Sequence, residues 1–254
     1  MRWIEKIKMK LAVICCLHGN EPYGLEVIKR LPDSFSFFIG NKRALKENRR
    51  FLETDLNRCF PGNKFGNHEE RIACYLTKKL KKFDYVIDLH STSKSCPIFG
   101  IITKLNKEKI ELAKKMGLKR LVIMPEFFAS GKAMIDYVKC GISLEVGPHN
   151  RPDNVKESLE LIKNLIENKD CNSLEIYKVF KLIRKEFYEV LINNFDSIKK
   201  GQIISREGEK EQYAEEDFTA VLVNEETYEG ILCLACEKVS CLTFQNLFKC
   251  PLSF

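Results

Sequence analysis

Apolar and polar residues alternate along the first two thirds of the chain in blocks that predict strands separated by helices. Residues 11–17 form a continuous apolar run, which is typical of a strand buried on both faces. Residues 21–31 carry apolar Leu25, Ile28 and Leu31 at helical spacing. Further strands are predicted at 34–41, 84–90, 97–103, 119–124 and 142–146, and further helices from 68, at 106–116 and at 153–167. Such alternation implies a mostly parallel sheet flanked by helices.

Two segments interrupt this pattern. Residues 42–66 are rich in Asn, Arg and Gly and show little periodicity, and loops of that length are usually functional. The helix after them has a capping-box-like start, with Asn67 as the cap and Glu70 at the third helical position. The second interruption, ENKDCNS at 167–173, is the best candidate for a domain boundary.

Beyond that boundary the pattern changes to short strands with turns. Strands are predicted at 175–180, 201–205, 218–224 and 230–239, and one amphipathic stretch lies near 181–192. We therefore predict an α/β domain over residues 1–170 and a small β-rich C-terminal domain over residues 171–254.

The composition is that of an ordinary soluble globular protein. The 254 residues, 44% hydrophobic and 30% charged, are enough to bury a sizeable core. The formal net charge of +7 comes mostly from lysines on predicted helix faces such as TKKLKK and AKKMGLKR. No basic block with interleaved aromatic residues accompanies them, so a solvated lysine surface is favoured over nucleic-acid binding. No apolar stretch is long enough to cross a bilayer, and no membrane partner is expected.

The cysteines indicate a reducing compartment. Cys15, Cys16, Cys140 and Cys233 sit inside apolar runs, where a thiol behaves as a small hydrophobic group. An odd count of 11, without framework spacing, argues against disulfides. The basic N-terminus followed by LAVICCL imitates a short signal peptide, but it lacks a small-residue cleavage site and leads directly into HGNE. We interpret it as the first core strand and expect a cytoplasmic protein.

Four C-terminal cysteines raise the question of a structural metal site. Cys233, Cys236, Cys241 and Cys250 could in principle hold a zinc ion. However, residues 230–239 are predicted as a strand, and residues three apart on a strand point to opposite faces. Buried thiols are therefore favoured over a four-cysteine zinc site.

Histidine and glutamate residues stand where predicted strands end. His18 and Glu21 follow the first strand, His90 ends the strand DYVIDLH, and Glu145 ends GISLEV. In open α/β sheets, sites form just beyond the carboxyl ends of the strands. Two imidazoles and one carboxylate are the protein ligands of a catalytic zinc ion, which keeps a fourth position for water. The alternative, for each histidine taken alone, is a hydrogen-bonded structural residue.

Four motifs follow one another along the chain: HGNEPYG, NKRALKENRRFLETDLNRCFPG, DLHST and SLEVGP. In this order they resemble the succinylglutamate desuccinylase/aspartoacylase family of zinc-dependent amidohydrolases, and a weaker match, VNEETYEG, extends the resemblance into the C-terminal portion. That family is related in fold to the zinc carboxypeptidases. The resemblance therefore implies a zinc-carboxypeptidase-like mixed, mostly parallel sheet flanked by helices, with a small β-rich C-terminal domain.

The resemblance also implies catalytic roles at matching positions. His18, Glu21 and His90 would hold one zinc ion per chain. Glu145 would be the general base that takes a proton from zinc-bound water and passes it to the leaving amine. Arg50, in ENRRF, would polarise the scissile carbonyl and stabilise its oxyanion, although a solvated loop arginine is the alternative.

Substrate-binding roles follow in the same way. Asn57 and Arg58, in DLNR, would grip a substrate carboxylate, although a solvated loop arginine is the alternative for Arg58. Tyr228 matches a tyrosine that reaches the substrate from the C-terminal domain, and a domain-interface aromatic is its alternative. Lys132 is the best match to the arginine that binds a second carboxylate in the aspartoacylase subgroup, and phenylalanines precede it where a tyrosine is expected. Lysine keeps the charge but loses the bidentate fork, so N-acetylaspartate is not the expected substrate.

Physical chemistry supports these assignments. Zinc lowers the pKa of bound water to about 7, and a carboxylate beside that water contributes roughly 10²–10⁴-fold to the rate. One preorganised donor at an oxyanion contributes about 3–4 kcal/mol, and a guanidinium fork suits a carboxylate. Asp55 and Asp88 lie within the motifs and are expected to orient the loop or a histidine rather than to touch substrate.

The expected function is that of a zinc-dependent hydrolase that cleaves the amide bond of an N-acylated amino acid or a similar small carboxylated amide. A zinc carboxypeptidase acting on short peptides is the alternative within the enzymes, and an ester could be attacked by the same groups. A non-catalytic ligand-binding homologue is disfavoured because mere binding has no use for Glu145 as a proton shuttle. The sequence leaves open the acyl group, the amino acid, the physiological metal and the oligomeric state, a homo-oligomer included.

Overall fold

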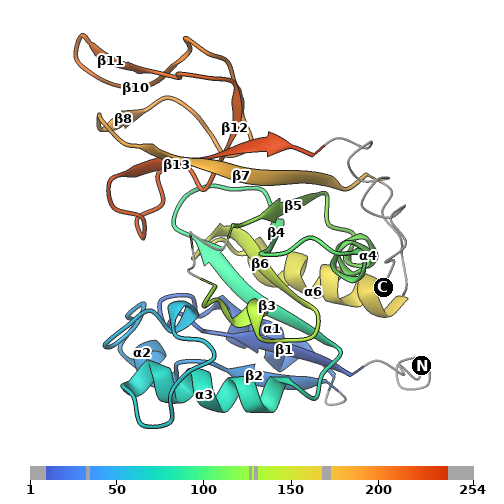
Figure 1. The fold of residues 1–254 in the computed structure, drawn as a ribbon. Coiled ribbons are helices and arrows are strands. Elements are labelled where there is room, and N and C mark those ends of the chain that lie inside the picture. The colour runs from blue at the N-terminus through green and yellow to red at the C-terminus, as the bar shows by residue number, and fades with distance from the viewer. Residues whose placement is uncertain (1–9, 33–34, 126–127, 129–130, 168–172, 240–254) are drawn as a thin grey trace, which may run out of the picture.

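A ten-stranded mixed sheet runs through the molecule (Figure 1). The computed structural model describes residues 10–32, 35–125, 128, 131–167 and 173–239. The strands of this sheet are β1 (Leu11–Cys15), β2 (Ser36–Ile39), β3 (Tyr85–Thr92), β4 (Phe99–Ile102), β5 (Arg120–Ile123), β6 (Gly141–Pro148), β7 (Glu175–Arg184), β9 (Ser197–Ile198), β12 (Phe218–Val221) and β13 (Ile231–Lys238). Their order is β2-β1-β3-β6-β4-β5-β7-β13-β12-β9.

The N-terminal part of the sheet is mostly parallel. β1 pairs in parallel with β2 and β3, β3 pairs in parallel with β6, and β4 pairs in parallel with β5. β4 and β6 form the antiparallel pair of this part. Parallel pairing brings the carboxyl ends of β1, β3 and β6 to one edge, and it sets His90 of β3 opposite Glu145 of β6. The predicted mostly parallel sheet flanked by helices is confirmed.

Helices cover both faces of this part of the sheet. α1 (Tyr23–Arg30), α4 (Lys107–Met116) and α6 (Asp153–Glu167) pack on one face, and α3 (His68–Leu80) packs on the other. The alternation of side chains along β1 shows why two cores form, because Val13 joins the first hydrophobic cluster and Ile14 joins the second. Apolar residues on both faces therefore fix the strand between two helical layers.

Local capping signals define the start of α3 as the sequence indicates. The Asn67 side chain accepts a hydrogen bond from the Glu70 backbone N–H, and the Glu70 carboxylate accepts one from the Asn67 N–H. Ala73, Leu76 and Leu80 then recur at helical spacing and are buried beneath the sheet. The predicted capping box is confirmed.

The segment 42–66 has more structure than its sequence indicates. It contains a short helix, α2 (Lys42–Lys46), and a 3₁₀ turn, η1 (Leu56–Arg58). Asn41 caps α2 by accepting from the Ala44 N–H, and Asp55 caps η1 by accepting from the Asn57 N–H. Elements this short have no room for an apolar repeat, so periodicity could not reveal them.

The strands after residue 173 extend the same sheet. β7 pairs in parallel with β5 and antiparallel with β13, while β12 pairs antiparallel with β13 and β9. A separate three-stranded sheet consists of β8 (Glu189–Val190), β10 (Ile203–Glu207) and β11 (Lys210–Tyr213). The predicted β-rich C-terminal region is confirmed, and the amphipathic stretch near 181–192 contains the end of β7 and all of β8.

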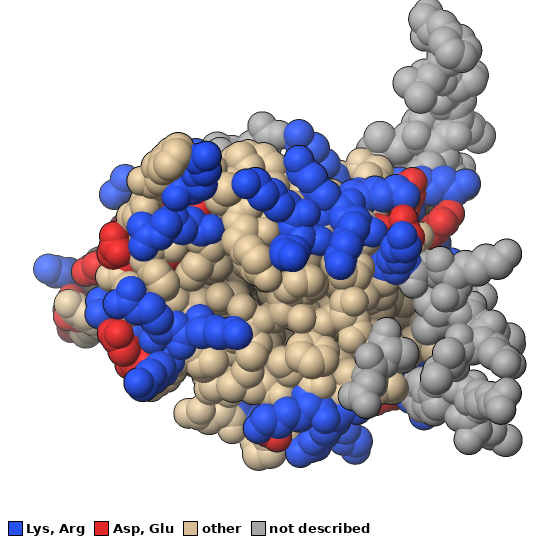
Figure 2. All heavy atoms as spheres, turned by 90° about the horizontal axis from the view of Figure 1, so that it is seen from below, with Lys and Arg blue, Asp and Glu red and all other residues tan. Residues whose placement is uncertain are grey.

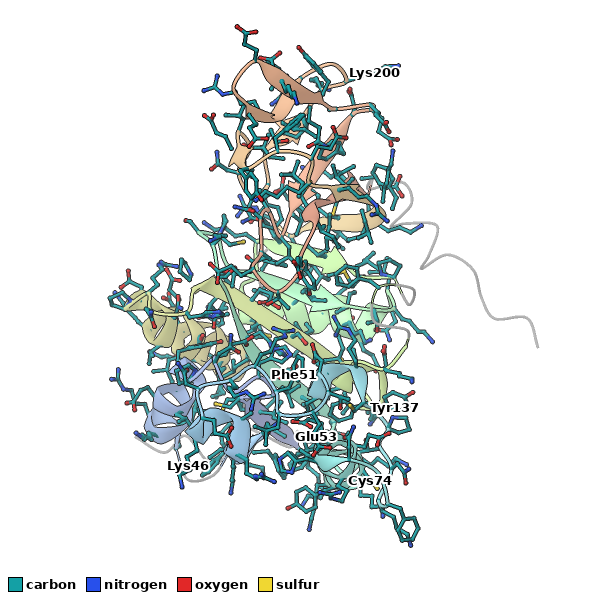
Figure 3. All side chains as sticks on the ribbon, turned by 90° about the vertical axis from the view of Figure 1, so that its left-hand side faces the viewer. Lys46, Phe51, Glu53, Cys74, Tyr137 and Lys200 are labelled. Atoms are coloured by element: carbon teal, nitrogen blue, oxygen red, sulfur yellow. The ribbon has the colours of Figure 1, made fainter. Side chains whose placement is uncertain are left out.

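The C-terminal region lies at one end of the molecule. In Figure 3, Lys200 marks the tip of this region, and Lys46 and Cys74 mark the opposite end. Because β5 and β7 are hydrogen-bonded neighbours, the sheet itself does not stop at the predicted boundary. The division into domains 1–170 and 171–254 stays a prediction.

Two of the four C-terminal cysteines lie in β13 and face opposite sides of the sheet. Cys233 packs in the hydrophobic cluster of the C-terminal strands, whereas Cys236 packs in the cluster that includes α3 and β1. Burial raises the pKa of both thiols to about 12, which keeps them protonated and poor as metal ligands. Cys241 and Cys250 lie outside the described residues.

Lysine and arginine side chains are scattered widely over the face opposite the C-terminal strands, with few acidic side chains among them (Figure 2). The exposed basic residues of α2 and α3 are Lys42, Arg43, Lys46, Arg71, Lys78 and Lys79. Solvation of this surface, in place of nucleic-acid binding, stays a prediction. Within the described ranges, none of the helices is both long and apolar enough to cross a membrane.

η2 (Met134–Asp136), a 3₁₀ turn before β6, completes the elements that surround the candidate site. Its first backbone N–H, on Met134, donates to the Asn57 side chain of η1. This hydrogen bond ties the segment 42–66 to the residues that precede β6.

Candidate active site

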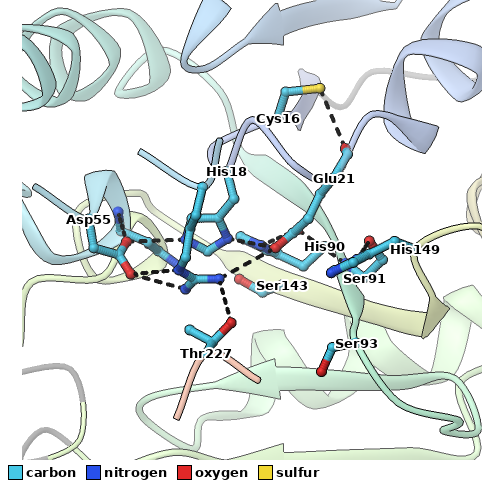
Figure 4. A network of polar contacts seen from close by, with 12 residues as sticks. Cys16, His18, Glu21, Asp55, His90, Ser91, Ser93, Ser143, His149 and Thr227 are labelled. Carbon is cyan, nitrogen blue, oxygen red and sulfur yellow. Dashed lines mark hydrogen bonds and ion pairs between the residues drawn. The ribbon is translucent and has the colours of Figure 1, made fainter. Parts of the chain in front are cut away.

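His18, Glu21 and His90 meet at the carboxyl edge of the sheet. His18 and Glu21 lie between β1 and α1, and His90 lies in β3. Nδ1 of His18 is 2.7 Å from Oε1 of Glu21, and Nδ1 of His90 is 3.0 Å from Oε2 (Figure 4). Potential ligand atoms of these three buried residues lie within 4.8 Å of one another, the one such group in the described part of the chain.

Each imidazole has an aspartate at its other nitrogen. Nε2 of His18 is 3.1 Å from Oδ1 of Asp55, and Nε2 of His90 is 2.7 Å from Oδ2 of Asp88. The same Asp88 oxygen accepts a hydrogen bond of 3.1 Å from the Ser143 hydroxyl. These acceptors are suited to hold the proton on Nε2 of each ring, so that Nδ1 is the nitrogen directed at Glu21. The predicted orienting contacts of Asp55 and Asp88 are therefore present, and the donor set fits a catalytic zinc ion.

Glu21 stays ionised although it is buried. Burial disfavours its charged form, but His18 and His90 outweigh that effect and hold the pKa of Glu21 below its ordinary value. The Ser91 backbone N–H also donates to Oε2 over 3.1 Å. A carboxylate that remains charged in a buried site is what a divalent cation requires of its ligand.

Arg50 reaches this group from the segment 42–66. Its Nε and Nη2 donate to Oδ2 of Asp55 over 3.3 and 3.0 Å, and its Nη1 lies 3.7 Å from Oε1 of Glu21. Nη1 also donates to the Thr227 hydroxyl of the C-terminal region over 3.3 Å. Burial opposes the charge, but Asp55 and Glu21 raise the pKa of Arg50, so its guanidinium is a fixed cation beside the histidines.

Glu69, at the start of α3, holds the backbone of this segment. Its Oε1 accepts from the Asn41 side chain and from the Leu52 N–H, both over 2.8 Å. Its Oε2 accepts from the Glu53 and Thr54 N–H groups over 3.2 and 3.3 Å. Burial works against ionisation, but the Leu52 N–H and the other donors lower the pKa of Glu69. This residue was not predicted from the sequence, because it resembles any acidic residue in a first helical turn.

Asn57 and Arg58 lie side by side in η1 and line the same cavity. Oδ1 of Asn57 accepts from the Met134 N–H over 2.8 Å, and among the described residues its NH₂ group has no hydrogen-bond partner. Nη1 of Arg58 donates to the Asn57 carbonyl over 2.9 Å, and its guanidinium carbon lies 5.9 Å from the centre of the Phe128 ring. Both residues therefore offer N–H donors to an anion.

Glu145 projects from β6 into the same cavity as the three potential ligands. It stands opposite His90 of β3 and opposite Phe99 of β4 in the sheet register. Burial raises the pKa of Glu145 to about 8; His90 acts in the opposite direction, and Glu21 and Glu225 reinforce the increase. A carboxyl group that exchanges its proton near neutral pH is suited to general acid–base work.

One cavity, partly open to solvent, connects these groups. Its polar wall holds the three potential ligands, Arg50, Asn57, Arg58 and Glu145. Its apolar wall includes Ile101, Met124, Phe128, Ile135 and Leu222. The Tyr228 ring also lines it and packs edge-on against Phe128, with ring centroids 5.1 Å apart. The cavity is thus shared between the α/β part and the C-terminal region.

Lys132 does not lie with the other predicted site residues. Its side chain is exposed and is not part of the cavity wall. Its backbone carbonyl accepts a hydrogen bond of 3.2 Å from the Phe60 N–H. The structure therefore brings together eight of the nine predicted site residues and leaves Lys132 outside.

Glu225 is a buried wall residue that the sequence analysis did not single out. Its Oε2 accepts from the Ser93 backbone N–H over 2.8 Å and from the Ser93 hydroxyl over 2.7 Å. The signal that could have found it is its place in VNEETYEG, three residues before Tyr228. Ser143, in SLEVGP, and Thr227, in VNEETYEG, were missed as well, because only the acidic and aromatic residues of these motifs were assigned roles.

The catalytic-domain model of the succinylglutamate desuccinylase/aspartoacylase family matches residues 8–167. The chain belongs to this family. The matched span contains His18, Glu21, Arg50, His90 and Glu145, so it covers the polar wall of the cavity. The resemblance seen in the sequence motifs is confirmed.

Members of the succinylglutamate desuccinylase/aspartoacylase family are among the similar proteins. A probable aspartoacylase of Acaryochloris marina is 33% identical over 123 residues, which are 41% of this chain and 42% of that protein. The N-acyl-aromatic-L-amino acid amidohydrolase (carboxylate-forming) B of Danio rerio is 26% identical over 170 residues, or 54% of each chain. The match thus spans less than half of the first relative and about half of the second.

Solved structures of the family share the fold. Murine aminoacylase 3 superposes with a TM-score of 0.77 at 20% identity, over 91% of this chain and 95% of that one. A succinylglutamate desuccinylase/aspartoacylase from Rhodobacter sphaeroides has a TM-score of 0.72 at 15% identity, over 91% and 86%. The likeness includes the C-terminal strands as well as the α/β part, so it confirms the fold class of the family.

Proposed function

We propose that this family member is a zinc-dependent hydrolase that cleaves the amide bond of an N-acylated amino acid or a similar small carboxylated amide. The observation that carries this proposal is the place of Glu145, directly opposite His90 on the neighbouring strand and in one cavity with the three potential ligands. A proton-exchanging carboxylate at that position is the feature that a hydrolase needs.

His18, Glu21 and His90 are the residues that would hold the zinc ion. When bound, such an ion supplies a Lewis acid that activates water and polarises an acyl oxygen. Asp55 and Asp88 keep both imidazoles in the tautomer that presents Nδ1. The aspartates thereby fix the direction of the two rings before an ion arrives.

Glu145 moves the proton. Its carboxylate takes a proton from the attacking water and then donates it to the nitrogen of the leaving amine. Burial and the nearby charges of Glu21 and Glu225 strengthen its hold on the proton between these two transfers. General acid–base catalysis of this kind contributes roughly 10²–10⁴-fold.

Arg50 stabilises the negative charge that develops on the acyl oxygen. Asp55 and the Thr227 hydroxyl hold its guanidinium beside Glu21, so the cation is already oriented before substrate binds. Asn57 and Arg58 bind the carboxylate of the amino acid through their free N–H groups. Tyr228 covers the substrate from the C-terminal side.

The C-terminal region restricts the size of the substrate. Leu222, Glu225, Thr227 and Tyr228 line the cavity, and all four belong to the predicted domain 171–254. A polypeptide substrate would have to pass this wall, whereas a small acyl-amino acid fits behind it. Lys132 as a ligand of a second carboxylate stays a prediction of the sequence.

Hydrolysis assays of the zinc-loaded chain test this proposal. The panel consists of N-acetyl, N-formyl and N-succinyl amino acids, dipeptides and an ester analogue, with release of free amine or acid as the readout. We expect acyl-amino acids to be cleaved with kcat/KM at least about tenfold above dipeptides. Cleavage of dipeptides alone would indicate a carboxypeptidase, and binding without any cleavage would indicate a ligand-binding homologue.

A further inference from the structure

We propose that the cavity accepts amino acids with an uncharged, apolar side chain, and that Ile101, Met124 and Ile135 form the pocket for it. This inference rests on the proposed function and specifies its substrate class. It predicts that acyl derivatives of leucine or methionine are better substrates than those of aspartate or glutamate.

The position of the pocket follows from the groups around the carboxylate-binding pair. Asn57 is hydrogen-bonded to the Met134 backbone, so Ile135, the next residue in the chain, lies near it. The Arg58 guanidinium faces the Phe128 ring. A carboxylate held by Asn57 and Arg58 therefore places the adjoining side chain of the substrate at the apolar wall of the cavity.

The apolar wall is the part of the hydrophobic core that borders the cavity. Ile101 of β4 stands opposite Ser143 of β6, and Met124 follows β5, where its N–H donates to the Ile102 carbonyl over 2.7 Å. Ile101, Met124 and Ile135 are buried and belong to one hydrophobic cluster that continues beneath the cavity. Such a wall has no group that could replace the water around a charged side chain.

The charges in the wall do not match a second carboxylate. In the part of the chain that the structure describes, the cavity wall contains two basic side chains, those of Arg50 and Arg58. Arg50 already pairs with Asp55, and Arg58 is needed for the first carboxylate. Three carboxylates, those of Glu21, Glu145 and Glu225, line the same cavity.

The sequence just before Lys132 contains no basic residue. Residues 125–131 read PEFFASG, with one acidic residue among them. The Lys132 side chain is exposed and lies outside the cavity wall. The hydroxyl of Thr103, a polar group in the wall, is already engaged as a donor to Asp136. A second substrate carboxylate would therefore be buried without a partner.

Substrates of matched shape separate charge from size. We expect kcat/KM of the zinc-loaded chain to be at least about 100-fold higher for N-acetyl-L-leucine than for N-acetyl-L-aspartate, with N-acetyl-L-asparagine in between. The longer set of N-acetylmethionine, N-acetylglutamine and N-acetylglutamate should give the same order. Preference for the acidic member of either set, while hydrolysis proceeds, overturns this inference and leaves the proposed function standing.

A binding measurement provides a readout that does not depend on turnover. Calorimetric titration of the Glu145→Gln variant should give a Kd for N-acetyl-L-leucine at least about tenfold lower than for N-acetyl-L-aspartate. Equal or inverse affinities contradict the apolar pocket. Failure of the zinc-loaded wild type to cleave any amide of the panel overturns the proposed function and this inference together.

Substitutions at Met124 test the pocket directly. Met124→Lys introduces a cation of similar length, and it should raise the ratio of kcat/KM for N-acetylglutamate over N-acetylmethionine by at least about tenfold. Met124→Gln, which has the length without the charge, should not produce that change. An unchanged ratio in a folded Met124→Lys protein contradicts the assignment.

Enlarging the pocket provides a second test that does not bury a charge. Ile135→Ala should shift preference from N-acetylleucine toward N-acetylphenylalanine by about tenfold, because the cavity gains the volume of the three side-chain carbons that are removed. Ile162→Ala is the matched control, since Ile162 is equally buried but lies in the cluster on the other face of the sheet. The same shift in both variants would show that the preference does not arise in this pocket.

Discussion

The two walls of the cavity are held by different interactions. The polar wall joins the turn after β1, the end of β3 and the segment 50–58 through charged and hydrogen-bonded pairs, with His18 bonded to both Glu21 and Asp55. The apolar wall comes from β4, the residue after β5 and η2, where Ile101, Met124 and Ile135 continue the core. A charged pair loses its stability when one partner is removed, whereas an apolar contact weakens in proportion to the volume removed. Changes in the polar wall should therefore act on chemistry and metal, and changes in the apolar wall on the choice of substrate.

Among changes in the polar wall, removal of a potential metal ligand should have the largest effect. His90→Ala should lose the bound zinc and the activity with it, because the remaining His18 and Glu21 cannot complete the donor set. Metal content after gel filtration, measured by mass spectrometry, checks this. The matched control is His149→Ala, since His149 interacts with the Ser91 hydroxyl over 2.8 Å but is not one of the three potential ligands. Full zinc occupancy in His90→Ala would refute the ligand set.

Removal of the proton carrier should leave the metal and stop the reaction. Glu145→Gln keeps the size of the side chain, and kcat should fall by roughly 10²–10⁴-fold while zinc content is unchanged. The control is Glu225→Gln, a buried carboxylate of the same cavity whose Oε2 is occupied by Ser93. Glu225→Gln should lose far less activity, and equal losses in both variants would remove Glu145 from its role.

Replacement of an orienting aspartate should produce a smaller, graded loss. Asp88→Asn weakens the acceptor at Nε2 of His90, and zinc affinity should fall by about 10–100-fold. Competition with a chelating dye measures the change. Asp136→Asn, a partly buried aspartate beside the apolar wall, should leave zinc affinity as it is. A similar loss of zinc affinity in both variants would contradict the expectation that only the polar wall supports the metal.

Replacement of Glu69 should affect stability more than chemistry. Glu69→Gln is expected to lower the free energy of unfolding by about 1.5 kcal/mol, because a charged acceptor of backbone N–H groups becomes neutral. The folded-state pKa of Glu69 lies below its ordinary value of 4.5, so its contribution is fully present above pH 4.5 and is lost as the pH falls through that lower value. Urea unfolding at several pH values checks this.

The control for the Glu69→Gln variant is Glu108→Gln. Glu108 is also an acidic residue in a first helical turn, that of α4, but its side chain is exposed. Its replacement should change the free energy of unfolding by no more than about 0.5 kcal/mol. A difference between wild type and Glu69→Gln that persists unchanged below pH 3 would rule out the proposed electrostatic origin.

The sequence predicted the sheet and the polar wall well because both depend on local signals. Continuous apolar runs mark β1, β3 and β6, and the histidines stand at or just beyond the ends of these strands. The capping box at Asn67 and Glu70 is equally local, since both hydrogen bonds span three residues. These features need no knowledge of distant contacts.

The apolar wall could not be predicted in the same way. Ile101 and Ile102 are neighbours in one apolar strand, yet Ile101 lines the cavity and Ile102 packs in the core on the other face. Only the pairing of β4 with β6 decides which of them meets the substrate. Lys132 shows a different limit of sequence comparison, because a matching position in a motif does not determine where an exposed side chain points, and its role stays a prediction.

The parallel pairing of β5 with β7 has a consequence for how substrate enters. Four residue pairs, from Arg120 with Glu175 to Ile123 with Lys178, connect the two strands in register. A hinge rotation of the whole C-terminal region away from the α/β part would have to break the backbone hydrogen bonds between β5 and β7. For the substrates proposed above, we therefore expect entry to depend on the short stretch that carries Thr227 and Tyr228 rather than on a movement of the whole C-terminal region.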